Sequence, residues 1–328
     1  MQLKVLLIVL PSFIIVTIFL TYLLFFHFEY VVIGIIYIVI SLIVGITLVK
    51  AGLYSPQSVF ENTSKETINV QKVDVSFDDG VKSTGLIYRS LTETISTPNG
   101  KQYQNPRPII IFFHGFMDDK EVNNMFMIPL AQMGYISAAF DQRGHGEAGG
   151  KKEDMYKLYN DVKIFIDKVC TFEDVKEGAI CCIGKSMGAT SVLTKAYEDE
   201  RVAMVIGIAA LHDVETLLNR DFTFLSAGWG IKRAMKHMGS QSALNMVAHK
   251  FLKRDSDYNK KRVYLIHGEK DSIFPPEITF ELNKKQAKIP DDQAILIKNC
   301  GHDFKYQEPL LFGIILKWIL ENEKMKMN

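Results

Sequence analysis

Cysteine, tryptophan and net charge are scarce in this chain. Its 328 residues include four cysteines and two tryptophans, and its formal net charge at pH 7 is +1. Cys181 and Cys182 are adjacent, while Cys170 and Cys300 stand alone, so no spacing indicates a disulfide framework or a cysteine metal site. This usage of cysteine is typical of the reducing cytoplasm.

The balance of charge excludes further classes of protein. The first 50 residues hold two lysines and one glutamate, so the remainder of the chain is formally neutral. A neutral domain has no global field that would attract nucleic acid or another polyanion. The motif H-E-x-x-H and the Walker and Rossmann glycine patterns are absent as well. We therefore expect no metal, no cofactor and no nucleic-acid partner.

Charged residues are almost missing from the start of the chain, where only three of the first 49 positions can carry charge. Residues 3–26 and 31–49 each come close to the ~20 residues with which an apolar helix spans a bilayer. The short segment between them allows only a tight reversal. This pattern predicts a transmembrane helical hairpin over residues 1–50. A cleaved secretory signal is the alternative, but the first apolar run is too long and a second one follows at once.

The charges at the ends of this hairpin predict its orientation. Lys4 and Lys50 flank the apolar runs, whereas their connection holds Glu29 and no lysine or arginine. The positive-inside rule then places both ends of the hairpin, and the domain that follows, in the cytoplasm. The sequence thus predicts a multi-pass membrane protein with two helices and a cytoplasmic main domain.

Changes of composition divide the rest of the chain. Residues 51–68 are polar and turn-rich, which is typical of a linker, and residues 69–328 form the main domain. That domain begins with a β-hairpin whose turn is at residues 78–80. From Pro108 onward, short apolar strands alternate with amphipathic helices, which predicts an α/β fold with a mostly parallel central sheet and helices on both faces. Strands are expected at residues 109–113, 135–140, 180–183, 202–209, 262–266 and 294–297, and helices at residues 120–133, 155–170 and 309–323.

Residues 211–259 are longer than the loop and helix that such a sheet needs between two strands. They are rich in phenylalanine and methionine, with basic residues interspersed. This composition predicts a small helical lid over the carboxyl end of the sheet, and it would also suit contact with a bilayer surface. A single covering helix with a long loop is the alternative.

The residues around Ser186 form the strongest local pattern. An apolar strand breaks at the motif G-K-S-M-G (residues 184–188) and continues as a helix through Lys195. In a G-x-S-x-G turn, a strained backbone exposes the serine hydroxyl, and the glycines let the strand and the helix cross closely. The pattern predicts that Ser186 is a nucleophile.

Three further motifs follow predicted strands. They are H-G-F at residues 114–116, D-Q-R-G-H-G at residues 141–146, and the pair Asp271 and His302. Together with the serine motif they resemble the α/β-hydrolase superfamily over about residues 70–322. The second motif is most similar to the branch that holds monoglyceride lipases, esterases and proline iminopeptidases. The resemblance implies an α/β-hydrolase fold and a triad in the chain order nucleophile, acid, histidine.

This resemblance implies that His302 is the base. A serine hydroxyl is a poor nucleophile near neutral pH and needs a base, and His302 follows the last strand, where the family places it. In the family, His114 and His145 shape loops, and His267 positions the acid loop. The other histidines fall in the predicted lid or the membrane turn, at His27, His212, His237 and His249.

Asp271 occupies the family's acid position in the run H-G-E-K-D. It is expected to orient the histidine and to stabilise the imidazolium that forms during the reaction. Glu269, Asp303 and Asp213 are rivals for this role.

Two backbone N–H groups are implied as donors to the oxyanion, those of Phe116 and Met187. Loss of one such donor costs on the order of 3 kcal/mol of transition-state stabilisation. The side chains of Phe116, Met117 and Met187 are expected to line an apolar substrate pocket, with simple core packing as the alternative for Met117. Lys185 departs from the aromatic residue or histidine common at its position in lipases, which leaves the specificity of the pocket open.

These residues predict a membrane-anchored serine hydrolase that cleaves carboxylic esters through an acyl-enzyme. Lipid-like esters of the acylglycerol or lysophospholipid type are the expected substrates, because an anchor would keep the site near them. A peptidase or thioesterase would use the same triad, although the lid region holds few acids that could bind a substrate amino group, namely Asp213, Glu215 and Asp221. A non-catalytic membrane interaction protein is the alternative from another class, which the complete triad disfavours. The oligomeric state is not predicted.

Overall fold

The computed structural model describes residues 17, 18, 39, 67–91, 95–96, 102–103, 105–221, 245–253 and 255–327. The chain divides into two compact units, Met1–Val59 and Phe60–Asn328, and the second contains the central sheet. Apart from three single positions, the hairpin predicted for residues 1–50 lies outside the described residues, as do most of the predicted linker and residues 222–244 of the predicted lid. Within the described ranges, no helix combines the length and the apolar character that crossing a membrane requires.

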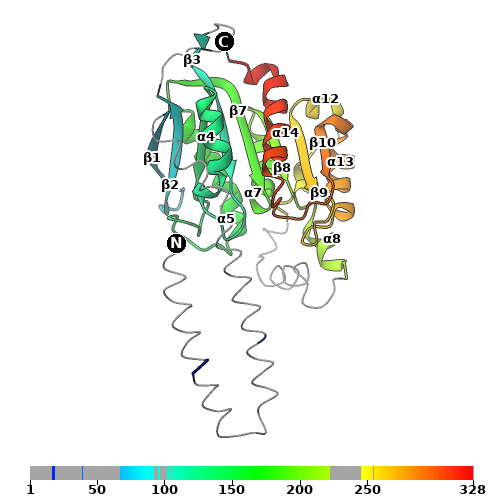
Figure 1. Ribbon diagram of the computed structural model, residues 1–328. Helices are drawn as coiled ribbons and strands as arrows, with labels where there is room; N and C mark the ends of the chain where they lie inside the picture. Colours follow the sequence, from blue (N-terminus) through cyan, green and yellow to red (C-terminus); the bar gives the residue numbers. More distant parts are fainter. Residues whose placement is uncertain are drawn as a thin grey trace. The chain divides into compact units, whose positions relative to one another are not determined.

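Eight strands form one sheet in the order β1-β2-β6-β5-β7-β8-β9-β10, with β1 at one edge and β10 at the other (Figure 1). The β1–β2 and β2–β6 pairs are antiparallel, and every other neighbouring pair is parallel. The mostly parallel sheet expected from the sequence is therefore confirmed. The bounds are β1 Ile68–Ser76, β2 Lys82–Ser90, β5 Arg107–Phe113, β6 Ile136–Phe140, β7 Val175–Lys185, β8 Val202–Ile208, β9 Val263–Gly268 and β10 Ala294–Ile297, with a separate small pair of β3 Ile95–Ser96 and β4 Gln102–Tyr103.

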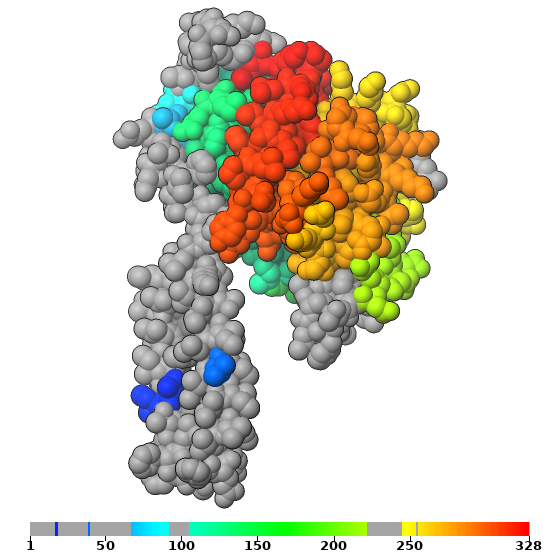
Figure 2. All heavy atoms as spheres, turned by 45° about the vertical axis from the view of Figure 1, so that its right-hand side comes forward, coloured from blue at the N-terminus to red at the C-terminus, as the bar shows by residue number. Residues whose placement is uncertain are grey.

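Helices cover both faces of this sheet. On one face, α4 and α14 pack together through Phe126 and Phe312, whose ring centroids are 6.2 Å apart. Figure 2 shows α14, in red, running beside α4, in green. On the other face, Phe165 of α6 stacks on Phe140 of β6 with centroids 4.7 Å apart. The helices are η2 Lys120–Asn123, α4 Asn124–Gln132, α5 Met155–Asn160, α6 Val162–Val169, α7 Met187–Ser191, η3 Val192–Ala196, α8 Val214–Asn219, α11 Ala248–Phe251, α12 Ser256–Asn259, η4 Pro276–Ile278, α13 Phe280–Ala287, η5 Asp291–Gln293, α14 Glu308–Glu321 and η6 Glu323–Met325.

Two helices differ from the sequence expectation. The helix expected at residues 155–170 is divided at Asp161, which ends α5 and precedes α6. The side chain of Asp161 is buried because it binds Arg143, so its position is fixed by a tertiary contact. Helix α13 was not predicted. Its buried face consists of Phe280, Asn283 and Ala287, and the polar member weakens the apolar repeat that would reveal the helix.

Candidate active site

Ser186 lies on a sharp turn between β7 and α7. Its backbone has φ 55° and ψ −114°, in the region that residues with a side chain rarely adopt. Its N–H donates to the carbonyl of Ile208 at 2.8 Å, which ties the turn to β8. A Cβ atom at Gly188 would lie 2.1 Å from the carbonyl oxygen of Phe113, so the helix can approach β5 this closely only with glycine there. The local sequence thus forces the serine hydroxyl out of the turn.

The structure brings His302 to this hydroxyl. His302 Nε2 is 3.0 Å from Ser186 Oγ, and His302 Nδ1 is 2.7 Å from Asp271 Oδ2. Because a carboxylate can only accept, Nδ1 carries the ring proton of neutral His302, and Nε2 is left to accept the proton of the serine hydroxyl. The three side chains follow the carboxyl ends of β7, β9 and β10. The sequence analysis expected each of them to follow a strand.

Asp271 is buried and fully hydrogen-bonded. Its Oδ1 accepts the N–H groups of Ile273 and Phe274, both at 2.9 Å, and His267 Nε2 lies 3.2 Å from Oδ2. Burial alone would raise the pKa of Asp271, but hydrogen bonds from His267 and His302 outweigh it and hold that pKa below its usual range. The carboxylate is therefore ionised at neutral pH, in the state that can stabilise an imidazolium.

The acid loop and the histidine loop are joined through their backbones. The N–H of Lys270 donates to the carbonyl of Cys300 at 2.8 Å. A Cβ at Gly268 would lie 2.5 Å from the same carbonyl, so only glycine permits this contact. This close approach fixes the separation of Asp271 and His302.

The rival acids have other partners. Glu269 Oε2 accepts the N–H of Asn299, and Asp213 caps α8 by accepting the N–H of Thr216. The side chain of Asp303 is 81% exposed and pairs with Lys185 at 3.4 Å. None of these three carboxylates contacts the His302 ring in the described structure.

His114 has the loop-shaping position that the resemblance implied. Its Nε2 accepts the N–H of Gln142 at 2.9 Å, so Nδ1 carries the proton and donates to the carbonyl of Gly115 at 2.8 Å. Burial lowers the pKa of His114 to about 4, which keeps the ring neutral at pH 7. His145 packs against Phe116 with ring centroids 5.4 Å apart and binds the carbonyl of Arg143. Both rings support the loop that ends in the first expected oxyanion donor.

His212 and His249 pack against each other in the described flanks of residues 211–259, with centroids 5.0 Å apart. His212 Nδ1 lies 2.9 Å from Asn283 Oδ1, which gives this ring a structural role. His27 and His237 lie outside the described residues.

The N–H of Met187 directly follows Ser186, and Gly115, the neighbour of Phe116, lies so close that a Cβ there would be 3.8 Å from Ser186 Cβ. Among the hydrogen bonds of the described residues, neither the N–H of Phe116 nor that of Met187 has an acceptor, and Met187 is the first residue of α7, where helix N–H groups lack partners. Asp118, which the sequence did not single out, closes the turn around Phe116, because its backbone N–H donates to the carbonyl of Gly115 at 3.4 Å. Partial burial raises the pKa of its carboxyl against the opposing effect of Lys185.

An apolar cluster adjoins the serine. Phe116 and Met187 belong to it, as expected, whereas Met117 differs: it is 69% exposed, outside the cluster, with its sulfur 3.1 Å from Lys152 Nζ. Its left-handed backbone, φ 69°, turns it away. Three members on α5 were missed from the sequence, because their helical spacing looks like ordinary core: Met155, Leu158 and Tyr159. The remaining two, Met246 and Phe251, lie in the segment predicted as a lid.

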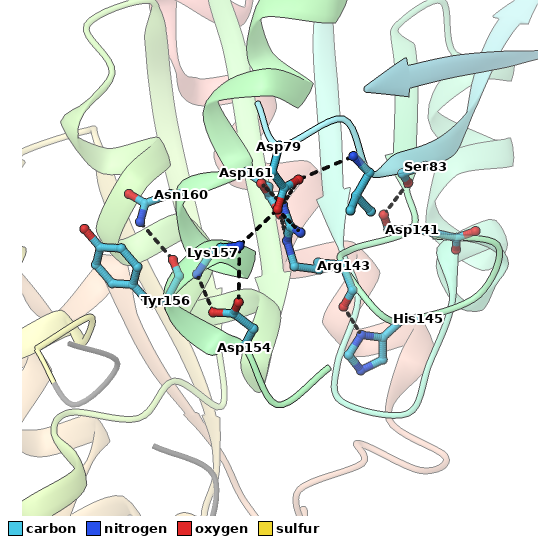
Figure 3. Close-up of polar contacts among 11 residues, drawn as sticks. Asp79, Ser83, Asp141, Arg143, His145, Asp154, Tyr156, Lys157, Asn160 and Asp161 are labelled. Carbon is cyan, nitrogen blue, oxygen red and sulfur yellow. Dashed lines mark hydrogen bonds and ion pairs between the residues drawn. The ribbon is translucent and has the colours of Figure 1, made fainter. Parts of the chain in front are cut away.

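An ion network fixes α5, which supplies part of this cluster (Figure 3). The guanidinium of Arg143 binds Asp161 through Nε and Nη2 at 2.7 and 2.9 Å, and binds Asp79 through Nη1 and Nη2 at 2.9 and 3.1 Å. It also lies 4.6 Å from the ring centroid of Phe77. Arg143 therefore joins the turn between β1 and β2 to the junction of α5 and α6. Lys157 adds a more exposed contact to Asp79 at 3.1 Å.

Metal ligands are not gathered anywhere in the described part of the chain, where no three His, Cys, Asp or Glu side chains are placed to hold an ion.

Comparison with known proteins gives the class. The family model described as Serine aminopeptidase, S33, matches residues 104–261, just under half of the chain; that range includes Ser186 and ends before Asp271 and His302. A search of curated protein sequences found no match.

Solved structures resemble most of the chain. Est1E from Butyrivibrio proteoclasticus, in a structure with bound ferulic acid, is 19% identical with a TM-score of 0.55, covering 76% of this chain and 98% of that one. An esterase of Pyrococcus furiosus is 19% identical with a TM-score of 0.55, covering 81% and 95%. An acylaminoacyl peptidase is 14% identical with a TM-score of 0.57, covering 80% of this chain and 43% of that one.

The sheet order, the family match and these structures define an α/β-hydrolase fold. The family match and these structures together support a serine hydrolase with this fold.

Proposed function

We propose that this enzyme cleaves carboxylic esters with Ser186 as nucleophile. The observation that carries the proposal is the unbroken series of hydrogen bonds from Asp271 through His302 to the serine hydroxyl, 2.7 and 3.0 Å long. At these distances, His302 Nε2 can take the proton of Ser186 as its oxygen bonds to the ester carbonyl carbon. Asp271 keeps the ring oriented and stabilises the imidazolium.

The oxyanion of the tetrahedral intermediate then binds the N–H groups of Phe116 and Met187. His302 returns the proton to the leaving alcohol oxygen, which leaves the acyl group on Ser186. Water gives a proton to the same Nε2 as its oxygen attacks the acyl carbon, which forms a second oxyanion at the same two donors. When this intermediate breaks down, Nε2 returns the proton to Ser186 Oγ as the bond between Oγ and the acyl carbon breaks, and the acid is released. Each of these steps is assigned to a group that lies at or next to Ser186.

Lipid-like esters, acylglycerols or lysophospholipids, are the proposed substrates. The apolar cluster beside Ser186 supports an acyl chain. The two apolar runs of residues 1–50 support an anchor in a bilayer, and Lys4 and Lys50 support a cytoplasmic main domain. An anchored site would meet its substrates in the same membrane.

An aminopeptidase is the second candidate, because the matched family model carries that description. Such an enzyme needs a free carboxylate for the substrate ammonium group. Beside the oxyanion loop, the carboxyl of Asp118 is partly buried, and the Lys185 ammonium is close enough to lower its pKa against the effect of burial. The charges of the described site therefore favour an ester substrate over a peptide substrate with a free, positively charged amino terminus.

The test is covalent labelling of detergent-solubilised full-length protein with a fluorophosphonate probe, with mapping of the adduct. We expect labelling at Ser186 that is lost in Ser186→Ala and His302→Ala. Ser191→Ala is the matched control: Ser191 lies on the same helix, its Oγ bonds Gln142 Oε1 at 2.8 Å, and labelling should persist. Well-folded wild type that remains unlabelled would refute the proposal.

Turnover of matched ester, thioester and aminoacyl amide substrates then separates the activities. Faster hydrolysis of the aminoacyl amide than of the ester would replace the esterase by the aminopeptidase.

Anchoring is tested by alkaline carbonate extraction of membranes that contain the full chain, which should leave it in the pellet. The acceptor triplet Asn62-Thr63-Ser64 reports the orientation, because it is modified only on the lumenal side. Glycosylation of Asn62 during synthesis into microsomes would refute the cytoplasmic placement.

A further inference from the structure

Lys152 lies against the loop that carries the first expected oxyanion donor. Its ammonium nitrogen is 5.5 Å from the ring centroid of Phe116 and 3.1 Å from the sulfur of Met117. Phe116 follows Gly115, where an added Cβ would lie 3.8 Å from Ser186 Cβ. The proposed chemistry at Ser186 gives this lysine no task, although its positive charge lies on the far side of a loop that touches the nucleophile.

The motif D-Q-R-G-H-G fixes the position of Lys152. Gly144 has φ 74°, and a Cβ there would lie 2.2 Å from the backbone nitrogen of Lys152, so only glycine permits this contact. The N–H of Gly144 also donates to the carbonyl of Gly149 at 2.9 Å, which closes the loop just before Lys152. The backbone of this lysine is therefore packed against the motif.

The charge of Lys152 has no carboxylate partner within ion-pair distance in the described part of the chain. Its contacts there are an aromatic ring and a thioether, and a thioether is a weak acceptor for an ammonium group with three N–H donors. Lys185, the other lysine beside the serine, differs because it pairs with Asp303 at 3.4 Å. Lys152 therefore keeps both charge and donors for a ligand.

The composition of the predicted lid points to the same sign of ligand. Residues 222–244 contain three basic residues, Lys232, Arg233 and Lys236, and neither aspartate nor glutamate. They fall between β8 and β9 in the chain, and β8 is the neighbour of β7, which ends just before Ser186. This segment has no carboxylate with which to neutralise Lys152. Positive charges without partners attract an anionic ligand over a Debye length of roughly 8 Å.

We propose that Lys152 binds an anionic group of the ester substrate, a phosphate or a carboxylate, and that the enzyme prefers anionic esters to neutral ones. This inference rests on the proposed function and divides the two substrate classes named there, because lysophospholipids carry a phosphate and acylglycerols do not. The neighbouring Met117 side chain is 69% exposed, so the anionic group can remain partly hydrated. Lys152 is then a specificity-determining residue, separate from the groups that move protons.

The test compares kcat/KM for a 1-acylglycerol and for its 3-phosphate, both with the same short acyl chain so that they stay monomeric. The full-length protein is used in a non-ionic detergent. Wild type should favour the phosphate. Lys152→Met removes the charge and should lower the ratio of phosphate to neutral substrate at least about fivefold, the effect of one charge pair about 4 Å apart even at the dielectric constant of water. Lys152→Arg restores the charge and should keep the ratio.

A second pair of substrates distinguishes the source of the negative charge. It consists of the methyl ester of a monocarboxylic acid and the monomethyl ester of the matching dicarboxylic acid. A ratio that depends on Lys152 in either pair supports the proposal. Dependence in the first pair identifies a phosphate on the alcohol, and dependence in the second identifies a carboxylate on the acyl group.

Lys151→Met is the matched control. Lys151 is the exposed neighbour of Lys152, so its substitution removes the same charge from the next position and should leave the ratio within about twofold. High salt should lower the ratio in wild type and change it little in Lys152→Met, because salt screens a charge that only wild type has. Fluorophosphonate labelling of Ser186 shows that the Lys152 variants still fold around the nucleophile.

The outcomes separate the two proposals. Absence of fluorophosphonate labelling in folded wild type refutes the proposed function and this inference with it. Labelling at Ser186, with the same substrate ratios in wild type and Lys152→Met for both pairs, refutes the inference and leaves the proposed function standing. An equal fall of the ratio in Lys151→Met and Lys152→Met also refutes it, since it would show a general effect of charge.

Discussion

The buried ring of His114 should make the stability of the enzyme depend on pH. Its folded pKa is about 4, lowered by burial from the ordinary value of 6.5. Below pH 6.5 the unfolded chain binds a proton at this position and the folded chain does not. The contribution of His114 to the free energy of unfolding is therefore fully present above pH 6.5. It falls as the pH decreases and stops falling once the folded ring also titrates near pH 4.

The size of the effect follows from the two pKa values. From pH 7 to pH 5, the unfolded state gains about three quarters of a proton at His114, while the folded state gains about a tenth of one. The free energy of unfolding should fall by about 2 kcal/mol over this interval from this residue alone, and by about 3 kcal/mol when titration is complete.

The assay is urea unfolding of wild type and His114→Asn at several pH values, with the difference between the two proteins plotted against pH. Asparagine keeps a donor and an acceptor but does not titrate, so the advantage of wild type should shrink by about 2 kcal/mol from pH 7 to pH 5. Ser137→Ala is the control, because its buried hydroxyl bonds the carbonyl of Met127 at 2.8 Å and has no proton to gain. A difference between wild type and His114→Asn that is constant over this interval would refute the reasoning.

Three substitutions test the rest of the site. Arg143→Ala leaves Asp161 buried without its partner, so urea unfolding should show that the free energy of unfolding falls by about 3–5 kcal/mol. In the control Lys157→Ala, which removes a half-exposed partner of Asp79, it should fall by less than about 1 kcal/mol. Gly188→Ala places a Cβ 2.1 Å from a carbonyl oxygen, so it should abolish fluorophosphonate labelling and lower the free energy of unfolding by about 1–3 kcal/mol; full labelling would contradict the close approach. Asp271→Asn should lower kcat by about 10³–10⁴ because the ring loses its orienting acceptor, while Asp303→Asn should leave kcat nearly unchanged, and equal effects would show that Asp271 is not the acid.

The apolar strand patterns, and the motifs that follow them, predicted most of the sheet and the positions of Ser186, Asp271 and His302 after strands. Parallel strands bring their carboxyl ends to one edge, so chain order is enough to place these three side chains together. Gly188 in α7 and Gly268 at the end of β9 add the close contacts.

The pocket could not be predicted in the same way. Leu158, Tyr159 and Met246 are distant in sequence and have no distinguishing motif, so only the fold shows that they meet Met187. Met117 looks equivalent to Phe116 in the sequence, yet one positive φ angle turns it to solvent. Asp118 was missed because nothing in the sequence shows that its carboxylate folds back against Gly115.

The three residues of the hydrogen-bonded series are far apart in the chain, and this separation has a consequence during translation. His302 follows Ser186 by 116 residues. At typical synthesis rates of 5–20 residues per second, the ribosome needs roughly 6 to 23 s to cover that distance. During this interval the nascent chain carries the serine without the imidazole of His302. Under the proposed mechanism, a growing polypeptide cannot hydrolyse nearby esters until the loop after β10 has emerged and docked.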